Sequence, residues 1–283
     1  MPNISGHVVV ITGAARGIGA ELARVLTGRG ARVALLGLEP AELAAVSATL
    51  PGSRAYEVDV TDSAALSDVA AGVVADFGRV DAVVANAGIG EGGPLLYSDP
   101  DVYDRVIEVN LLGSVRTVRA FLPAVVQSRG YVLQVASVAA LVPAPMMSAY
   151  CASKSGVEAF AHALRGEVRH HGVDVGVAYL TWTDTDMVRN ADQKAGLREL
   201  RARLPWVLGR TYALGPAVVR LADGLVARRA HVYGQGWLRL LPAFRGAFPA
   251  LTALGTPGLP QIEQQVRTER VAAVASGSAA ARR

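Results

Sequence analysis

Residues 8–19 read Val-Val-Val-Ile-Thr-Gly-Ala-Ala-Arg-Gly-Ile-Gly, a run of β-branched residues followed directly by a loop with three glycines. The apolar run has the length and composition of a buried β-strand. Beyond the loop, Ile18, Leu22, Val25 and Leu26 recur at helical spacing. The stretch therefore predicts a strand, a tight turn and a helix in direct succession, which is how a βαβ unit begins.

The same alternation of short apolar runs and helical patterns continues along the chain, without an internal repeat. The runs that we predict to be strands are His7–Thr12, Ala31–Leu36, Ala55–Val58, Val80–Ala85, Tyr131–Ala136, Val173–Tyr179 and His231–Tyr233. Several are apolar throughout, as expected of strands covered on both faces. The predicted fold class is α/β, a doubly wound (Rossmann-type) parallel sheet of about seven strands with helices on both faces.

Composition narrows the class of protein. Of 283 residues, 51% are hydrophobic and 18% are charged, which supports a folded core. The net charge of +4 permits an anionic ligand, but the arginines are scattered, so we expect no nucleic-acid binding. The single cysteine, Cys151, suits the reducing cytoplasm. Since no signal peptide and no stretch of about 18 apolar residues is apparent, we expect a cytoplasmic protein without a membrane-spanning segment.

The chain changes character after the last predicted strand. We expect residues 1–235 to form one domain, residues 236–275 to form a hydrophobic extension rich in Pro and Gly, and residues 276–283 to form a disordered tail. The extension could widen a ligand pocket, pack against a partner subunit or lie on a membrane surface. Its prolines argue against a clean amphipathic helix, so pocket or subunit packing is favoured over membrane contact.

The loop of residues 12–19 has the composition of a phosphate-binding turn rather than of a purely structural one. Glycine is needed where the turn is tight and where a side chain would hold a pyrophosphate off the backbone. The helix that follows points free N–H groups and its positive dipole end at the phosphates. The position between a strand and a helix therefore predicts dinucleotide binding through Gly13, Arg16, Gly17, Ile18 and Gly19.

The end of the second predicted strand bears on the choice between NAD and NADP. An acidic residue there usually binds the ribose 2′-hydroxyl, but the sequence reads Leu36-Gly37-Leu38-Glu39. Glu39 precedes Pro40 and is more simply interpreted as a helix cap, whereas Arg16 could attract a 2′-phosphate. We expect Leu38 to line the cofactor site. Both cofactors stay open, and the pattern slightly favours NADP.

Tyr150-Cys151-Ala152-Ser153-Lys154 lies at the start of a predicted helix, so Tyr150 and Lys154 share one face. A phenol with a pKa of about 10 is a poor base at neutral pH, and a cation within about 4–6 Å typically lowers such a pKa by about 1 to 3. Ser137 follows a predicted strand, thirteen residues before Tyr150. The pattern predicts that Tyr150 is an acid/base group whose pKa is lowered by Lys154.

Together these motifs resemble the classical short-chain dehydrogenase/reductase family, over about residues 5–235. The matching elements, in the family's order and at about its spacing, are residues 12–19, Asp59-Val60, Asn86-Ala87-Gly88, Asn110, Ser137, Tyr150 and Lys154. The resemblance implies an oxidoreductase that transfers a hydride between NAD(P) and an alcohol or ketone. It also implies a homodimer or homotetramer.

The resemblance implies roles for the catalytic residues. Tyr150 would exchange a proton with the substrate oxygen, and Ser137 would hydrogen-bond that oxygen. Lys154 would lower the pKa of Tyr150 and bind the nicotinamide ribose. Asn110 would hold a water molecule in a proton relay behind Lys154.

It likewise implies cofactor contacts. Asp59 and Val60 would contact the adenine, and Asn86, Ala87 and Gly88 would line the cofactor beside the fourth strand. The chain departs from the family after the sixth strand, where Leu180-Thr181 replaces the usual Pro-Gly. The backbone path and the carboxamide contacts are therefore in question there, although Thr183 and Thr185 are still expected to contact the cofactor.

Residues 187–212 fall where the family has its variable substrate loop. Their leucines, with Val207 and Trp206, could cover a small hydrophobic alcohol or ketone. Trp182 and Trp206 could equally line that pocket or fill the core. We expect no metal site, because no set of ligands at metal-binding spacing is apparent.

Two other functions are compatible with parts of the pattern. A non-catalytic NAD(P)-binding protein, acting in redox sensing or interaction, would need no proton relay, so the set Asn110, Ser137, Tyr150 and Lys154 argues against it. A nucleotide-sugar epimerase of the same broader fold is disfavoured by the glycine spacing and the small C-terminal portion.

Overall fold

The structure is a computed structural model that describes residues 3–193, 195–253, 258–264 and 266–267. One sheet of parallel strands runs through it in the order β3-β2-β1-β4-β5-β6-β7. The strands are β1 (Val8–Thr12), β2 (Arg32–Gly37), β3 (Arg54–Glu57), β4 (Ala82–Ala85), β5 (Tyr131–Val135), β6 (Asp174–Tyr179) and β7 (His231–Tyr233). Every predicted strand is confirmed, with its ends within two residues of the prediction.

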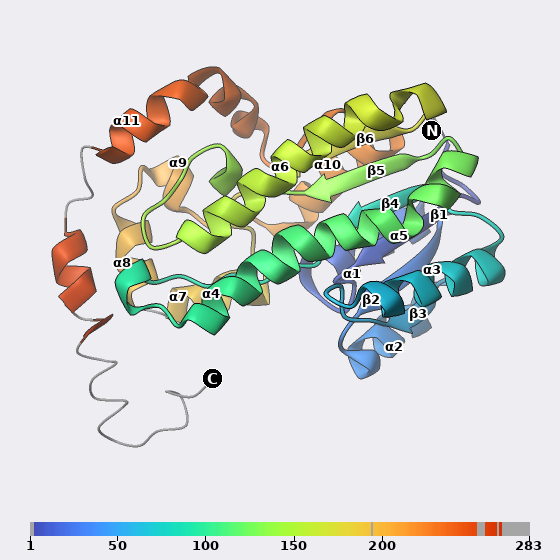
Figure 1. The fold of residues 1–283 in the computed structure, drawn as a ribbon, viewed down its shortest axis with the longest axis horizontal. Coiled ribbons are helices and arrows are strands. Elements are labelled where there is room, and N and C mark those ends of the chain that lie inside the picture. The colour runs from blue at the N-terminus through green and yellow to red at the C-terminus, as the bar shows by residue number, and fades with distance from the viewer. Residues whose placement is uncertain (1–2, 194, 254–257, 265, 268–283) are drawn as a thin grey trace.

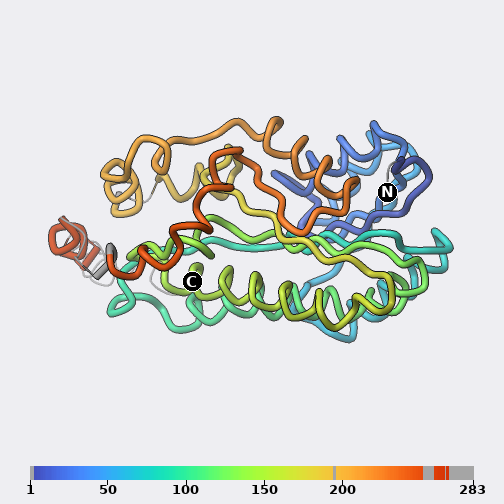
Figure 2. Tube along the Cα trace, turned by 90° about the horizontal axis from the view of Figure 1, so that it is seen from above, coloured from blue at the N-terminus to red at the C-terminus, as the bar shows by residue number. Residues whose placement is uncertain are grey.

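Helices cover both faces of the sheet (Figures 1 and 2). One layer contains α3 (Ser63–Phe77), α5 (Gly113–Gln127) and α6 (Ser148–Val168), and the other contains α1 (Gly17–Gly28), α2 (Pro40–Ala48) and α10 (Leu214–Val226). Alternate residues of β1 pack into opposite layers: Val9 and Ile11 meet the α1 side, Val8 and Val10 meet the α3 side. All four are fully buried, which explains why the strand is apolar throughout. The predicted fold class is confirmed.

The strand order reverses between β1 and β4, because the chain first builds outward through β2 and β3 and then continues on the other side. The loops that leave β1 and β4 diverge at this point and open a crevice at the carboxyl ends of the strands. The Thr12 side chain ties the two loops together, since its Oγ1 accepts the backbone N–H groups of Asn86 and Ala87, both at 3.0 Å.

One long helix crosses the α3 face. It consists of α4 (Pro100–Ile107), a π-helical turn η2 (Glu108–Leu112) and α5. Contrary to our expectation, its length and a mean hydropathy of 1.3 over 18 residues would allow it to span a membrane. Here, however, Val118, Phe121 and Val125 of this helix are buried between the sheet and α3. Of the apolar window, 44% is buried, and the apolar residues at these positions belong to the core on this face.

The predicted substrate loop is helical. It forms α7 (Asp186–Gln193), α8 (Ala195–Ala202) and α9 (Trp206–Gly209). Short 3₁₀ turns lie elsewhere, at η1 (Leu95–Tyr97), η3 (Val138–Ala140) and η4 (Arg169–His171).

The C-terminal extension runs along the edge of the molecule (Figure 1), and buried residues connect it to the rest of the chain. It begins with η5 (Gly236–Ala247) and α11 (Phe248–Ala253). Leu238 is fully buried in the core cluster on the α3 face, and Ile262 is fully buried against Leu197 and Leu200 of α8. Residues 254–257 and the predicted tail 276–283 lie outside the described residues. That residues 1–235 form a separate domain stays a prediction.

Candidate active site

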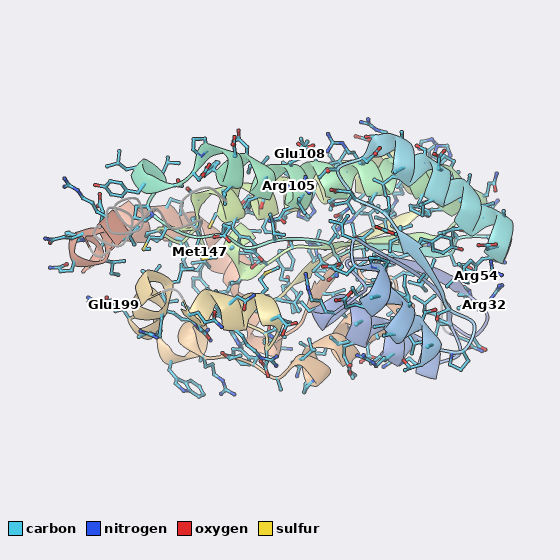
Figure 3. The ribbon with its side chains drawn as sticks, turned by 90° about the horizontal axis from the view of Figure 1, so that it is seen from below. Arg32, Arg54, Arg105, Glu108, Met147 and Glu199 are labelled. Carbon is cyan, nitrogen blue, oxygen red and sulfur yellow. The ribbon has the colours of Figure 1, made fainter. Side chains whose placement is uncertain are left out.

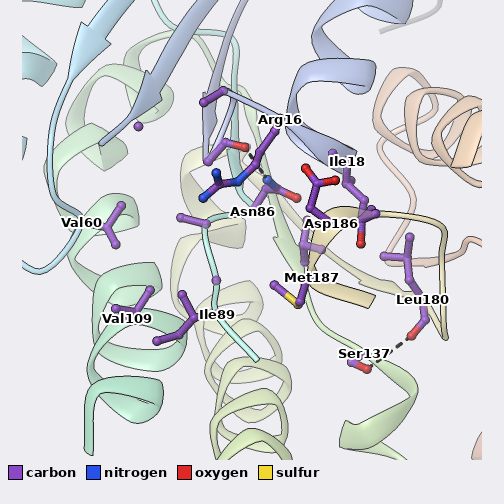
Figure 4. Close-up of a pocket in the computed structure, with 18 of the residues that line it drawn as sticks. Arg16, Ile18, Val60, Asn86, Ile89, Val109, Ser137, Leu180, Asp186 and Met187 are labelled. Atoms are coloured by element: carbon purple, nitrogen blue, oxygen red, sulfur yellow. Dashed lines mark hydrogen bonds between the residues drawn. The ribbon is translucent and has the colours of Figure 1, made fainter. Parts of the chain in front are cut away.

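A cleft lies at the carboxyl ends of the central strands, where the strand order reverses (Figure 4). Most of the predicted cofactor residues line it, namely Gly13, Arg16, Gly17, Ile18, Leu38, Asp59, Val60, Asn86, Ala87, Gly88, Tyr150, Lys154, Thr183 and Thr185. Gly19 and Asn110 lie behind its wall, so they act on the cleft through their neighbours. Figure 4 shows Arg16 and Asn86 towards one end of the cleft and Ser137 with Leu180 at the other.

The glycine loop brings two backbone segments into contact. Gly13 has a φ of +64°, and a β-carbon there would lie 2.9 Å from Cα of Ala87. A β-carbon on Gly19 would lie 2.2 Å from the carbonyl oxygen of Gly13. Any larger residue would push the turn away from the first turn of α1, so these positions are restricted to glycine.

The N-terminus of α1 fits an anionic ligand. Arg16, at the N-cap position, makes no side-chain cap hydrogen bond, and the first turn of the helix contains no acidic residue. The first backbone N–H groups of a helix lack intrahelical partners and carry the positive end of the dipole. The glycine cradle and this helix end together fit the pyrophosphate of a dinucleotide.

Asp59 forms an ion pair with Arg105 that the sequence did not reveal. Arg105 of α4 (Figure 3) donates to Asp59 Oδ2 at 2.9 Å and also lines the cleft. Burial raises the pKa of Asp59, but hydrogen bonds from Thr61 and Arg105 outweigh it, so the pKa lies below its ordinary value. Asp59 is thus a fixed carboxylate at the predicted adenine end. Because Arg105 lies 46 residues further along the chain, no local pattern indicates the pair.

The interpretation of Glu39 as a helix cap is wrong. Glu39 occupies the N-cap position of α2, but its side chain makes no cap hydrogen bond. Instead Oε1 accepts from Arg16 Nη2 at 2.5 Å, and both residues line the cleft. The charge of Arg16 across the cleft attracts the carboxylate more strongly than neutral N–H groups would. A carboxylate is therefore present near the end of β2 after all, and the reason for favouring NADP is weakened.

The predicted catalytic side chains meet at the far end of the cleft. Ser137 follows β5, while Tyr150 and Lys154 lie on one face of α6, as predicted. Lys154 Nζ donates to the carbonyl oxygen of Val135 at 2.9 Å and lies 5.8 Å from the centroid of the Tyr150 ring. Ser137 Oγ accepts from the backbone N–H of Ala139 at 3.2 Å and donates weakly to the carbonyl oxygen of Leu180 at 3.4 Å.

Burial shifts the pKa values of both Tyr150 and Lys154. Burial raises the pKa of Tyr150 above its ordinary value, and a hydrogen bond with Ser137 opposes that rise only in part. Burial also lowers the pKa of Lys154, to about 8. Desolvation of the phenol dominates in the chain by itself, and that Lys154 lowers the pKa of Tyr150 stays a prediction.

Asn110 is buried in the π-helical turn η2 and is fully engaged as a donor. Its Nδ2 donates to the carbonyl oxygen of Ile89 at 2.9 Å and to Ser153 Oγ at 3.1 Å, while Oδ1 accepts the Ile89 N–H at 2.8 Å. The side chain thereby fixes the segment after β4, beside Gly88 and Lys154. A water molecule could only donate to its Oδ1, and the water relay stays a prediction.

A second cavity of about 360 Å³ adjoins the cleft, and its walls are mainly apolar. The two cavities share Ser137, Tyr150, Thr181, Met187 and Val188. The remaining apolar wall comes from η3 and the segment after it, from the segment after β6, from the region of α7 to α9 and from α11. Its residues include Val138, Val142, Pro143, Pro145, Met147, Trp182, Ala191, Leu197, Leu200, Leu204, Leu208 and Phe248.

The structure separates the two tryptophans that the sequence left undecided. Trp182 lines the apolar cavity, where the guanidinium of Arg201 stacks on it at 4.6 Å. Trp206 is 71% exposed, so it neither lines this cavity nor fills the core. Within the described ranges, no group of three or more His, Cys, Asp or Glu residues could hold a metal ion.

A phenol, an ammonium group and a hydroxyl at the end of a nucleotide-binding cleft define the class of dinucleotide-dependent oxidoreductases. Comparison with known proteins indicates the same class. Residues 7–196 match the family model described as short chain dehydrogenase. The chain is 36% identical over 235 residues to Dehydrogenase/reductase SDR family member 7B of Bos taurus, covering 79% of this chain and 70% of the relative. It is 33% identical over 228 residues to the 3-oxoacyl-[acyl-carrier-protein] reductase FabG of Salmonella typhimurium, covering 78% and 91%.

Two solved structures of short-chain oxidoreductases are also similar to this chain. A metagenomic short-chain oxidoreductase in complex with NADP is 37% identical, with a TM-score of 0.60, over 62% of this chain and 83% of that one. A short chain dehydrogenase/reductase from Burkholderia phymatum in complex with NAD has a TM-score of 0.78 over 91% of this chain and 98% of that one, at 24% identity, which shows the fold. The chain belongs to the short-chain dehydrogenase/reductase family. It is an oxidoreductase that acts on CH–OH or carbonyl groups with NAD(P).

Proposed function

We propose that this protein reduces a hydrophobic ketone, or oxidises the corresponding secondary alcohol, with Tyr150 as the acid/base. One observation carries the proposal. Tyr150 and Ser137 lie on the wall shared by the glycine-lined cleft and the apolar cavity. A cofactor in the first and a substrate in the second would both reach these two side chains.

The residues of the cleft support nicotinamide dinucleotide binding. The Gly13–Gly19 cradle and the end of α1 would hold the pyrophosphate, Asp59 and Val60 the adenine end, and Lys154 the nicotinamide ribose. When bound, the nicotinamide supplies or accepts the hydride, and the protein supplies orientation and the proton.

The proton chemistry follows from the environment of Tyr150. The Ser137 hydroxyl would hydrogen-bond the substrate oxygen and hold it beside the phenol. Because burial raises the pKa of Tyr150, its hydroxyl is protonated at neutral pH. A protonated phenol can give its proton to a carbonyl oxygen that is being reduced, and in the reverse reaction the same oxygen would accept the proton of the alcohol.

Arg16 supports NADP as the slightly favoured cofactor, since its guanidinium lines the cleft and could bind a 2′-phosphate. Of the two similar solved structures, one holds NADP and the other NAD, so both cofactors stay open. Glu39 works in the opposite direction, because its carboxylate pairs with Arg16.

The apolar cavity supports a small hydrophobic substrate. Its arginine, Arg201, is buried and already bonded to Asp192 at 2.5 Å and to the carbonyl oxygen of Gly209 at 2.7 Å. A charged substrate would therefore gain little from Arg201, while hydrocarbon would replace water along the leucine-rich wall. We also propose, from the family and the composition, a homodimer or homotetramer in the cytoplasm that acts on free small molecules.

Turnover by Tyr150→Phe tests the proposal. A panel of aliphatic, lipid-like and steroid-like ketones is assayed with NADPH and NADH, and cofactor affinity is measured separately by fluorescence titration. Removing the acid/base group should lower turnover by about 10²- to 10⁴-fold and leave cofactor affinity nearly unchanged. Tyr103→Phe, on α4 and away from both cavities, is the control. Normal turnover by Tyr150→Phe would show that the roles are misassigned; cofactor binding without any turnover by the parent would favour a non-catalytic binding protein.

A further inference from the structure

Thr181 stands where the family usually has the glycine of its Pro-Gly pair. It is the second residue after β6, is 8% exposed and lines both cavities together with Ser137 and Tyr150. A side chain has thus been added at the point where cofactor and substrate would meet. A threonine adds both a methyl group and a hydroxyl there, so the question is what the hydroxyl does.

The backbone of Thr181 is held in place by a buried network. Its N–H donates to Oε1 of Gln235 at 3.1 Å, and its carbonyl oxygen accepts from Thr183 Oγ1 at 2.8 Å. Gln235 Nε2 in turn donates to Thr183 Oγ1 at 3.3 Å. Gln235 comes from the chain just after β7 and is itself buried. The backbone that carries the Thr181 side chain is therefore fixed from two elements.

The hydroxyl takes no part in this network. Thr181 Oγ1 is buried and has no hydrogen-bond partner among the described residues. Four other side-chain atoms in the described part share this state, in Thr27, Gln134, Arg228 and Trp237, and none of these residues lines either cavity. Leaving a buried hydroxyl unpaired lowers the stability of the folded protein. A partner supplied by a ligand would remove that cost at Thr181 alone.

We propose that the Thr181 hydroxyl binds the ligand, by a hydrogen bond to an uncharged polar group, an amide or a carbonyl, at the junction of the two cavities. A ligand reaches the buried hydroxyl after rotation about the Cα–Cβ bond, which moves the hydroxyl towards the position of the methyl group. The amide belongs to the nicotinamide carboxamide, the carbonyl to the substrate. The proposal rests on the proposed function in one respect, that these two molecules occupy the two cavities.

Thr181→Val tests this, because valine keeps the shape and removes the hydroxyl. Thr27→Val, on α1, is the matched control, since it also removes an unpaired buried hydroxyl but away from both cavities. Both variants should melt at or above the temperature of the parent protein, because each loses an unsatisfied group. Only Thr181→Val should lose ligand affinity, by about 2- to 10-fold, the loss of one hydrogen bond.

Two measurements identify the source of the partner. NADPH and NADH dissociation constants, from fluorescence titration without substrate, report on the carboxamide. KM for the best ketone at saturating cofactor reports on the substrate carbonyl. Thr181→Ser, which keeps the hydroxyl, should restore the affected constant. If Thr181→Val is poorly folded, the pair Thr181→Ala and Thr181→Ser gives the same comparison.

Unchanged dissociation constants and unchanged KM in the variant without the hydroxyl would overturn the proposal. So would a Thr181→Val protein that is less stable than Thr27→Val and binds as the parent does, because the hydroxyl would then have a partner within the protein. Failure of the proposed function is read separately, from turnover by Tyr150→Phe, and does not affect the cofactor titration.

Discussion

The cleft and the apolar cavity meet at Tyr150, yet they are built in different ways. The cleft depends on backbone: Gly13 and Gly19 let two main-chain segments touch, and the end of a helix faces the ligand. The apolar cavity depends on side-chain volume, contributed by the segment after η3, by α7 to α9 and by α11. A site made by backbone geometry demands glycine at fixed places, whereas a site made by volume accepts many apolar residues. The cleft can therefore be recognised in the sequence by a motif, whereas the apolar cavity is indicated only by composition.

The two regions also treat charge differently. The cleft carries two ion pairs, Arg16–Glu39 and Arg105–Asp59, whose arginines remain largely accessible. In the cavity, Arg201 is buried, bonded to Asp192 of α7 and to Gly209 of α9, and stacked on Trp182. The arginines of the cleft are accessible to a ligand, while Arg201 in the cavity stabilises the wall. This contrast predicts that substitutions in the two regions will affect different ligands.

The largest expected effect is on the backbone-built side. In Gly19→Ala the new β-carbon would lie 2.2 Å from the Gly13 carbonyl oxygen, so the loop must move and cofactor binding should be lost. Gly28→Ala, in the same helix, meets nothing within 4 Å and should be neutral or stabilising by up to about 1 kcal/mol. Fluorescence titration with NADPH and thermal melting measure both. Full cofactor affinity in Gly19→Ala would show that the cleft does not depend on this close contact.

At the junction, Lys154 should make stability depend on pH. Its pKa is about 8 in the folded protein against an ordinary 10.5, so between these values the unfolded chain binds more protons. The free energy of unfolding contributed by Lys154 therefore rises as the pH rises from about 8 to 10.5, by at most about 1.4 kcal/mol per pH unit. Denaturant unfolding of the parent and of Lys154→Met at several pH values measures this, because methionine does not titrate. A difference that stays constant with pH would mean that Lys154 keeps its ordinary pKa.

On the volume-built side, a smaller and selective effect is expected. Phe248→Ala removes a ring from the wall of the apolar cavity, and should raise KM for bulky apolar ketones by about tenfold without changing cofactor affinity. Phe244→Ala is the control, since Phe244 of η5 is exposed and away from the cavity. Equal KM values in the two variants would show that the extension does not contribute to substrate binding.

The smallest effect is expected at the rim of the cleft. Glu39→Gln removes the carboxylate that neutralises Arg16, so NADPH should gain about two- to threefold in affinity relative to NADH, in line with the low free energy of exposed ion pairs. Arg16→Gln should shift the ratio the other way. A ratio of the two dissociation constants that does not move in either variant would place the 2′-phosphate elsewhere.

Much of the fold and of the candidate site could be predicted from the sequence. The strands β1, β2, β4, β5 and β6 are buried along almost their whole length and consist mainly of apolar residues, which made them visible in the sequence. The edge strands β3 and β7 are more exposed and were predicted from shorter patterns. Ser137, Tyr150 and Lys154 follow a strand or share a helical face, which local periodicity reveals. The prediction failed for a long charged side chain, because its partner is distant in the sequence. Glu39 had the position of a cap, but Arg16, 23 residues earlier, was the stronger partner.

The sequence by itself determined the doubly wound sheet, the glycine turn and the set Ser137, Tyr150 and Lys154, because each depends on backbone geometry or on spacing within one element. Only the tertiary structure decided the Arg105–Asp59 pair, the apolar cavity with its contribution from Phe248, and the unpaired hydroxyl of Thr181. The burial of Tyr150, which raises the pKa of its phenol, was likewise visible only in the tertiary structure. The physical reason is common to all of these: burial and long-range contact set the free energy of a charged or polar group, and neither is a property of neighbouring residues in the chain.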